Sequence, residues 1–492
     1  MTPTTLTALT PAGLWLIAAA VCLALEAAGT PVGWRKRSSR THLPWIVGLA
    51  ALAVVAHAVA SWADAASPAS SAQGLVIDRI GLLAGGVLAL LVAAVHTAAA
   101  PALAAIDEER GEMSAGYAIV GAALSVACVT VDVVVLAAAL CVAAAAQALL
   151  CAPDREGPHG IEAATKGLVG AGLVLVVLAV AMVALWSGAG DTTYAALGRA
   201  LSLGTPVAGL GAACLIVVIA LVLGAVPFQQ SFVDVAHGAS SSSAGLLSGG
   251  MLVVGATCAV RLLDGVVEAG PNDLLANTLA LLAMLTLVGA PVASLDQARI
   301  GRVVAYLAAL PGGLVLAALA AGAWSKGGIA DPGAVRAALL AVLSGGLGCA
   351  AALLGVAIPR LDPSSTWEDW SGFGRTRPVM AAFLVYALGT LAGVPGTVGF
   401  SARTEAARAL FAQHQDLLGL VVVASAALGA APIVRLALFL FAKEVPSTRK
   451  GSERESGRGD LLVGTFAILV VACGLLEAWP GLLDELVAQA RR

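Results

Sequence analysis

A few charged side chains that stand inside or between long apolar segments are the residues of this chain that could do chemistry. They are Asp132, Glu162, Lys166, Arg403 and Arg435. A charge held near the middle of a bilayer is costly, so it usually belongs to an ion path or to a tight ion pair. These residues are therefore the candidates for moving or steering ions within a membrane.

Local context gives each of the first three candidates a second, purely structural interpretation. Glu162 and Lys166 are four residues apart, so they can form an ion pair on one helix face or belong to a polar path. Asp132 lies between two apolar segments and is most simply a loop or cap residue. No catalytic residue and no metal ligand is expected, because no cysteine or histidine cluster has the required spacing.

The two arginines are expected to face the interior of a helix bundle. Arg435 stands in the middle of an apolar run, and Arg403 follows a run broken by proline and glycine. Arg403 could alternatively anchor its segment at the membrane interface. Arginine keeps its charge at all ordinary pH values, so Arg403 could order water or pair with a carboxylate but could not relay protons.

Two apolar segments interrupt themselves in similar ways. Leu391–Arg403 contains Gly393, Pro395 and Gly396, and Leu223–Gln230 contains Pro227. Proline removes a backbone donor and glycine loosens the chain, so both segments should be broken helices. Broken helices in corresponding halves of a hydrophobic chain are typical of transporters built from inverted repeats.

Composition places the whole chain in a membrane. Of its 492 residues, 59% are hydrophobic and 12% are charged, and the mean hydropathy is +0.94. This predicts an all-α polytopic membrane protein with about fourteen spans and the lipid bilayer as its surroundings. The net charge of −3 argues against nucleic acid as a partner. The excess of lysine and arginine in alternate loops predicts that both termini lie outside a bacterial cytoplasmic membrane.

Five motifs in order along the chain resemble the antiporter-like membrane subunits of respiratory complex I, most closely the N-type subunit. They are Asp132–Cys141, Glu162–Gly170, Val226–Ala239, Gln297–Tyr306, and Trp370–Pro378 followed by Leu391–Arg403. The resemblance implies broken helices seven and twelve within two inverted five-helix repeats. It implies a division into residues 1–105, 106–263 (first repeat), 264–443 (second repeat) and 444–492. NADH, flavin, iron–sulfur clusters and quinone would then be bound by partner subunits, with no cofactor in this chain.

The chain departs from this family at the ionisable positions. The family's glutamate falls at Cys141, two of its lysines fall at Val222 and at Gly249 or Gly250, and Arg403 replaces a third lysine. The expected function is a membrane-arm subunit of an NADH-quinone oxidoreductase that takes part in, or structurally supports, redox-driven proton translocation. An Mrp-type cation/proton antiporter subunit and a non-conducting structural paralogue stay open as alternatives. The chain would be an enzyme only as part of such a translocase.

Overall fold

The protein is all-helical over the part of the chain that its structure, a computed structural model, describes. These residues are 3–28, 43–62, 65, 74–103, 110–151, 158–202, 206–267, 273–324, 332–357, 366–442, 464–465, 467–472 and 474. In chain order the helices are α1 (Pro3–Ala28), α3 (Leu43–Ser61), α4 (Arg79–Leu103), α5 (Arg110–Val129), α6 (Val133–Cys151), α7 (Pro158–Ala189), α8 (Tyr194–Ser202), α9 (Pro206–Val222), α10 (Gln230–Gly238), α11 (Ser241–Val267), α12 (Asp273–Leu295), α13 (Ile300–Ala308), α14 (Leu310–Trp324), α15 (Pro332–Ala357), η3 (Glu368–Trp370), α16 (Phe373–Thr376), α17 (Pro378–Ala392), α18 (Val398–Ala412) and α19 (Asp416–Leu440).

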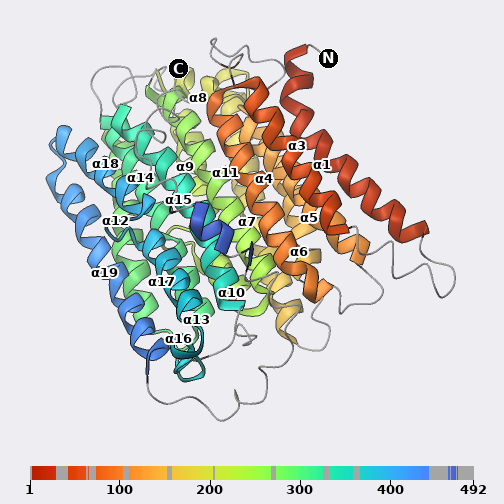
Figure 1. Ribbon diagram of the computed structural model, residues 1–492. Helices are drawn as coiled ribbons and strands as arrows, with labels where there is room; N and C mark the ends of the chain where they lie inside the picture. Colours follow the sequence, from red (N-terminus) through yellow and green to blue (C-terminus); the bar gives the residue numbers. More distant parts are fainter. Residues whose placement is uncertain are drawn as a thin grey trace.

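The long helices run side by side through one bundle (Figure 1). Within the described residues, ten helical stretches are long and apolar enough to cross a membrane. A helix satisfies its own backbone hydrogen bonds, which is why apolar segments of this length fold as helices in lipid. Three shorter apolar helices, Trp45–Ser61, Pro206–Val222 and Pro378–Ala392, lie where further spans were predicted. The all-α prediction is confirmed. The last of the fourteen spans was predicted from the apolar window at residues 461–479, of which the structure describes only 464–465, 467–472 and 474.

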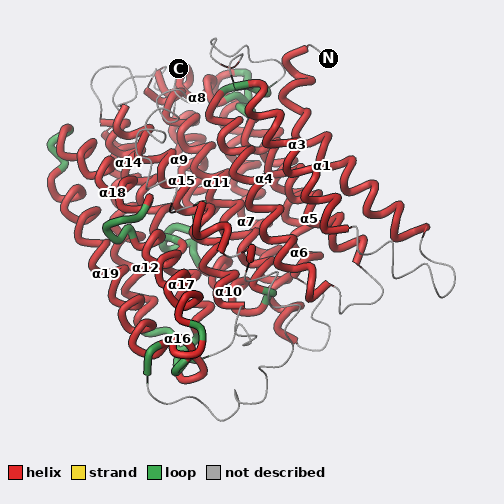
Figure 2. The backbone as a smooth tube through the Cα atoms, viewed as in Figure 1, coloured by secondary structure: helices red, strands yellow, loops and turns green. Residues whose placement is uncertain are grey.

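The two predicted helix breaks are present, and both begin with the same turn. Gly224 and Gly393 take left-handed backbone conformations, with φ of 63° and 70°. The next residue in each case, Ala225 or Val394, donates its N–H to the carbonyl five residues back, at 2.8 and 2.9 Å. This is the Schellman motif, which ends a helix at a glycine. Figure 2 shows the resulting loop segments within the bundle rather than only at its ends.

The centre of the molecule is formed by α11, α14 and α15. The apolar stretch of α15 is buried along its whole length, and those of α11 and of α13 with α14 are nearly so. By contrast, fewer than two fifths of the residues in the apolar windows of α1, α7 and α19 are buried, and large apolar side chains such as Leu16, Val183 and Leu438 are exposed. Exposed apolar faces of this extent fit lipid or neighbouring membrane subunits and not water. A candidate residue can therefore face either the α11–α15 core or the outside of the bundle.

Candidate functional site

Arg403 lies at the second helix break and is buried, with 2% of its surface exposed. Its Nη2 donates to the carbonyl of Ala392, the last residue of α17, at 2.8 Å. Its Nη1 donates to the carbonyl of Val422 and to the hydroxyl of Ser425, both on α19. The guanidinium thus joins the two halves of the broken helix to α19. A positive charge at the carbonyl end of α17 also suits the direction of that helix's dipole.

Glycine makes this arrangement possible at two positions. A Cβ atom on Gly393 would lie 2.5 Å from the Nε of Arg403, and one on Gly399 would lie 1.9 Å from the carbonyl oxygen of Thr390. Any side chain at either position would push α18 away from the end of α17. The glycines of this segment therefore set where the guanidinium can lie. Pro395 lacks a backbone N–H, so the helix cannot continue directly after Gly393.

No carboxylate pairs with Arg403 in the part of the chain that the structure describes. Glu405 instead pairs with Arg408 at 2.9 Å on the exposed side of α18. The Nε of Arg403 has no hydrogen-bond partner. The buried charge is therefore compensated by carbonyl and hydroxyl dipoles alone. A fixed positive charge of this kind holds water or repels cations, and it does not exchange protons.

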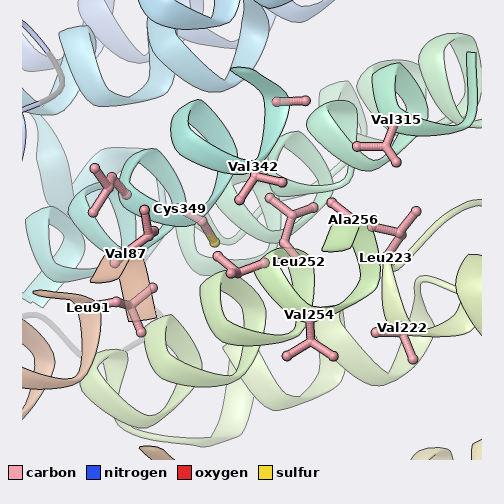
Figure 3. Packing of buried hydrophobic residues seen from close by; sticks show 14 of the residues in the cluster. Val87, Leu91, Val222, Leu223, Leu252, Val254, Ala256, Val315, Val342 and Cys349 are labelled. Carbon is pink, nitrogen blue, oxygen red and sulfur yellow. The ribbon is translucent and has the colours of Figure 1, made fainter. Parts of the chain in front are cut away.

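The first helix break has no charge at the matching place. Here the N–H of Val226 donates to the Thr286 hydroxyl of α12 at 3.1 Å, so a neutral side chain satisfies the freed backbone group. Val222, at the end of α9, is buried among apolar side chains. Figure 3 shows Val222 and Leu223 among other members of the buried hydrophobic cluster, such as Leu252 and Val254. The centre of the first half is apolar at the described positions where a relay would need groups that titrate.

Close backbone contact explains why no long side chain could stand at Gly249. A Cβ atom there would lie 2.6 Å from Cδ1 of Leu91 and 2.8 Å from the carbonyl oxygen of Gly346 on α15. At Gly250 it would lie 2.7 Å from Cδ1 of Leu124. Small residues let helices approach this closely in membranes. The space that a lysine would occupy is filled by the α11–α15 contact.

The polar residue of α6 that reaches the interior is Gln147 and not the residue at the family's glutamate position. Cys141 is exposed on the outer side of α6. Gln147 is buried and donates from Nε2 to the carbonyl of Ser243 at 2.7 Å. The sequence analysis did not name Gln147, although it is the one amide residue in the apolar run Val133–Cys151. The other residues of α6 are apolar on every side, so they do not indicate which face of the helix is buried.

Glu162 and Lys166 belong to an ion-pair network at the end of the bundle where Figure 1 shows α10 and α13. Lys166 Nζ lies 2.7 Å from Glu162 and 3.4 Å from Asp234 of α10. Asp234 also pairs with Arg302 of α13 at 3.0 Å. All four side chains are partly exposed. The predicted helical pair is present, and Asp234 and Arg302 extend it across three helices.

We expect Asp234→Asn to weaken this network more than Glu162→Gln, because Asp234 pairs with two cations. Partly exposed ion pairs contribute about 0.2–1 kcal/mol each, so the loss of stability should be small but measurable. Thermal unfolding of the purified chain in mild detergent tests this, with both variants run at low and high salt. The difference between the variants should shrink in high salt, which screens exposed charges. Equal unfolding temperatures at low salt would contradict the network.

Asp132 caps a helix. Its Oδ1 accepts the backbone N–H of Val134 at 2.7 Å and that of Val135 at 3.3 Å, at the start of α6. Its Oδ2 accepts the hydroxyl of Thr192 at 2.7 Å. A carboxylate that satisfies free N–H groups at a helix start is an ordinary N-cap. The geometry of Asp132 thus agrees with its structural interpretation.

Arg435 does not face the interior, so the prediction for this residue is wrong. It is exposed, and its Nη1 donates to the carbonyl of Leu295 at the end of α12, at 2.8 Å. Its guanidinium lies 4.4 Å from the ring centre of Trp367. A helix end and an aromatic face stabilise a cation without burial. These partners hold the arginine on the outer side of α19.

A buried ion pair that the sequence pattern did not reveal lies at the opposite end from the Lys166 network. Arg261 of α11, 5% exposed, pairs with Asp78 at 2.7 Å and donates to the carbonyl of Thr130 at 3.0 Å. Its partner lies far away in the sequence, so no local spacing could indicate the pair.

Comparison with known proteins identifies the family. The family described as "NADH:quinone oxidoreductase/Mrp antiporter, TM" matches residues 137–429, which include both helix breaks and Arg403. The chain belongs to this family. The resemblance to antiporter-like membrane subunits drawn from its motifs is therefore confirmed, and the chain is a multi-pass membrane protein.

Individual relatives agree with this assignment. NADH-quinone oxidoreductase subunit N of Thermobifida fusca (strain YX) is 28% identical, over 92% of this chain and 87% of its own length. A chain of the Mrp complex from Dietzia sp. DQ12-45-1b has a TM-score of 0.82 at 17% identity, covering 100% of this chain and 97% of its own. A chain of respiratory complex I from Thermus thermophilus has a TM-score of 0.73 at 18% identity, covering 95% and 98%. At such identities the two structures establish the shared fold alone.

Proposed function

We propose that this chain is a membrane-arm subunit of a bacterial NADH-quinone oxidoreductase, and that it supports redox-driven proton translocation mainly as a structural member. The observation that carries the structural role is the α11–α15 contact at Gly249 and Gly346, which fills the place of a family lysine. At two further positions where the family has a titratable residue, this chain has Val222, which is buried, and Cys141, which is exposed. A proton relay needs groups that titrate at working pH, and glycine and valine side chains do not titrate.

The finer architecture of the family is part of this proposal. About fourteen spans in two inverted repeats, at residues 106–263 and 264–443, would account for the two Schellman turns at Gly224 and Gly393. Residues 1–105 and 444–492 would flank the repeats. The basic loops support an orientation with both termini outside. NADH, flavin, iron–sulfur clusters and quinone would be held by partner subunits.

Purification from native membranes in mild detergent tests the assembly. We expect further membrane subunits and an NADH-oxidising activity to co-purify with the full-length chain, because α1, α7 and α19 present exposed apolar side chains such as Leu16, Val183 and Leu438. Co-purification with the subunits of a cation/proton antiporter would favour the Mrp-type alternative. A monodisperse monomer with its own transport activity would contradict both assemblies.

The structural role makes a separate prediction for Lys166. If no proton path runs through the first half, Lys166→Gln should leave the ratio of pumped protons to transferred electrons unchanged. The partly exposed ion pairs of Lys166 would be lost, with a small effect on stability. Proton pumping in inverted vesicles, normalised to electron transfer, measures this ratio. A large drop in the ratio in fully assembled complexes would place Lys166 on a path and contradict the structural role.

A further inference from the structure

An arginine stands among exposed apolar side chains where α12 meets α19. Figure 1 shows these two helices side by side at one edge of the bundle. Arg435 is exposed, and so are its neighbours on α19, Val434 at 58% and Leu438 at 70%. On α12 its hydrogen-bond partner, Leu295, is 36% exposed. We refer to these four residues as the α12–α19 seam. An apolar outer surface of this kind faces lipid or a membrane partner.

Two contacts hold the guanidinium of Arg435 at this seam. Its Nη1 donates to the carbonyl of Leu295, the last residue of α12, at 2.8 Å. Its central carbon lies 4.4 Å from the ring centre of Trp367. Trp367 is buried, and its Nε1 donates to the carbonyl of Gln297 at 2.8 Å, so the ring is fixed as well. Arginines of membrane helices commonly extend toward water. Here the head group is instead tied to the end of α12.

Most of the hydrogen-bond donors of Arg435 remain available. A guanidinium has five N–H groups and carries a permanent positive charge. One hydrogen bond, to Leu295, joins this guanidinium to the described residues. No carboxylate in that part of the chain pairs with it, although Asp296 directly follows Leu295. Donors that face lipid without an acceptor are costly, so the seam favours an acceptor from outside this chain.

Position and charge favour a phosphate group as this acceptor. Arg435 lies within the last two turns of α19, about 7 Å along the axis from its end. A cation near the end of a membrane helix is within reach of lipid head groups. Two more exposed arginines lie at this end of the bundle: Arg375, which donates to the carbonyl of Phe441 at 3.1 Å, and Arg377, the N-cap of α17. The planar guanidinium matches two phosphate oxygens at once.

We propose that the α12–α19 seam binds the phosphate group of an anionic phospholipid. Arg435 holds the phosphate with the donors that Leu295 leaves available, and the acyl chains lie along exposed apolar side chains such as Val292 of α12 and Val434 of α19. The further arginines at this end favour a lipid with a net negative charge. The proposal requires a membrane location and holds for either parent complex.

A photoreactive phosphatidylglycerol tests the proposal on the full-length chain in its purified membrane complex. The probe carries a diazirine in one acyl chain, and a phosphatidylcholine with the same diazirine serves as the zwitterionic comparison. In the wild type we expect phosphatidylglycerol to label α12 and α19 peptides several-fold more than phosphatidylcholine. Arg435→Gln should lower the phosphatidylglycerol label there about 5-fold, and Arg435→Lys, which keeps the charge, should lower it less. Peptides of α1 and α7 should be labelled equally in all forms.

Arg408→Gln is the matched control, because Arg408 is also an exposed arginine of a membrane helix but lies on α18. It should label like the wild type. Equal labelling of α12 and α19 in the wild type and in Arg435→Gln, or equal labelling by the two lipids, would overturn the proposal. So would efficient cross-linking of Arg435→Cys to a carboxylate-bearing helix of a neighbouring subunit, since the acceptor would then belong to a protein.

Discussion

Arg403→Leu should markedly reduce the amount of assembled complex, whereas Arg403→Lys should assemble. Leucine leaves the Ala392 carbonyl and the Ser425 hydroxyl without their buried donor. Each orphaned group costs about 1–3 kcal/mol. The desolvation penalty of the arginine, which leaves with it, offsets part of this loss, so we expect a net destabilisation of about 2 kcal/mol. Lysine keeps a charge and a donor in the same place.

The lysine variant also separates an electrostatic role from proton transfer. Lysine can lose its proton in a buried site and arginine cannot, so Arg403→Lys should retain or raise proton pumping if protons pass through the second half. Proton pumping in inverted vesicles, normalised to electron transfer, is the measurement. Arg408→Leu on the same helix is the control, because that side chain is 75% exposed and pairs only at the surface. Equal pumping in the wild type, Leu and Lys forms would show that Arg403 serves structure alone.

Gly249→Lys should prevent stable folding, although it restores the residue type that the family has near this position. Even the Cβ atom of Gly249→Ala would lie 2.8 Å from a backbone oxygen of α15, which cannot turn aside as a side chain can. Overpacking of this kind costs about 1–3 kcal/mol, and the longer lysine adds a buried charge beside Leu91 and the backbone of α15. We expect the alanine variant to unfold at a clearly lower temperature and the lysine variant not to accumulate.

Gly172→Ala is the matched control for this experiment. It is also a glycine within a membrane helix, but its Cβ position is open. Alanine is better than glycine inside a helix by about 0.5–1 kcal/mol, so Gly172→Ala should be neutral or slightly stabilising. Thermal unfolding in the same detergent compares the variants. A well-folded Gly249→Lys protein would mean that α11 and α15 can separate, and it would contradict the proposal that no proton path runs through the first half.

The sequence predicted the fold class and both helix breaks, because hydropathy, glycine and proline act locally. It also identified Arg403 as interior, since the charge follows a break whose freed carbonyl groups need donors. It placed Arg435 on the wrong side of α19 because membrane helices are apolar on every face, so periodicity does not reveal their rotation. Gln147, Asp234 and Arg261 were missed for a related reason: their partners lie far away in the sequence.

The glycine contact between α11 and α15 also bears on how this chain can evolve. Once the two backbones touch at Gly249 and Gly346, the site no longer accepts a side chain by a single substitution. A return to a lysine at this position would require coordinated changes at Leu91 and on α15, and each change alone would weaken the packing. A single substitution at Gly249 is therefore not expected to restore an ionisable side chain at this position. Substitutions outside the α11–α15 contact are therefore expected to be tolerated more easily than substitutions within it.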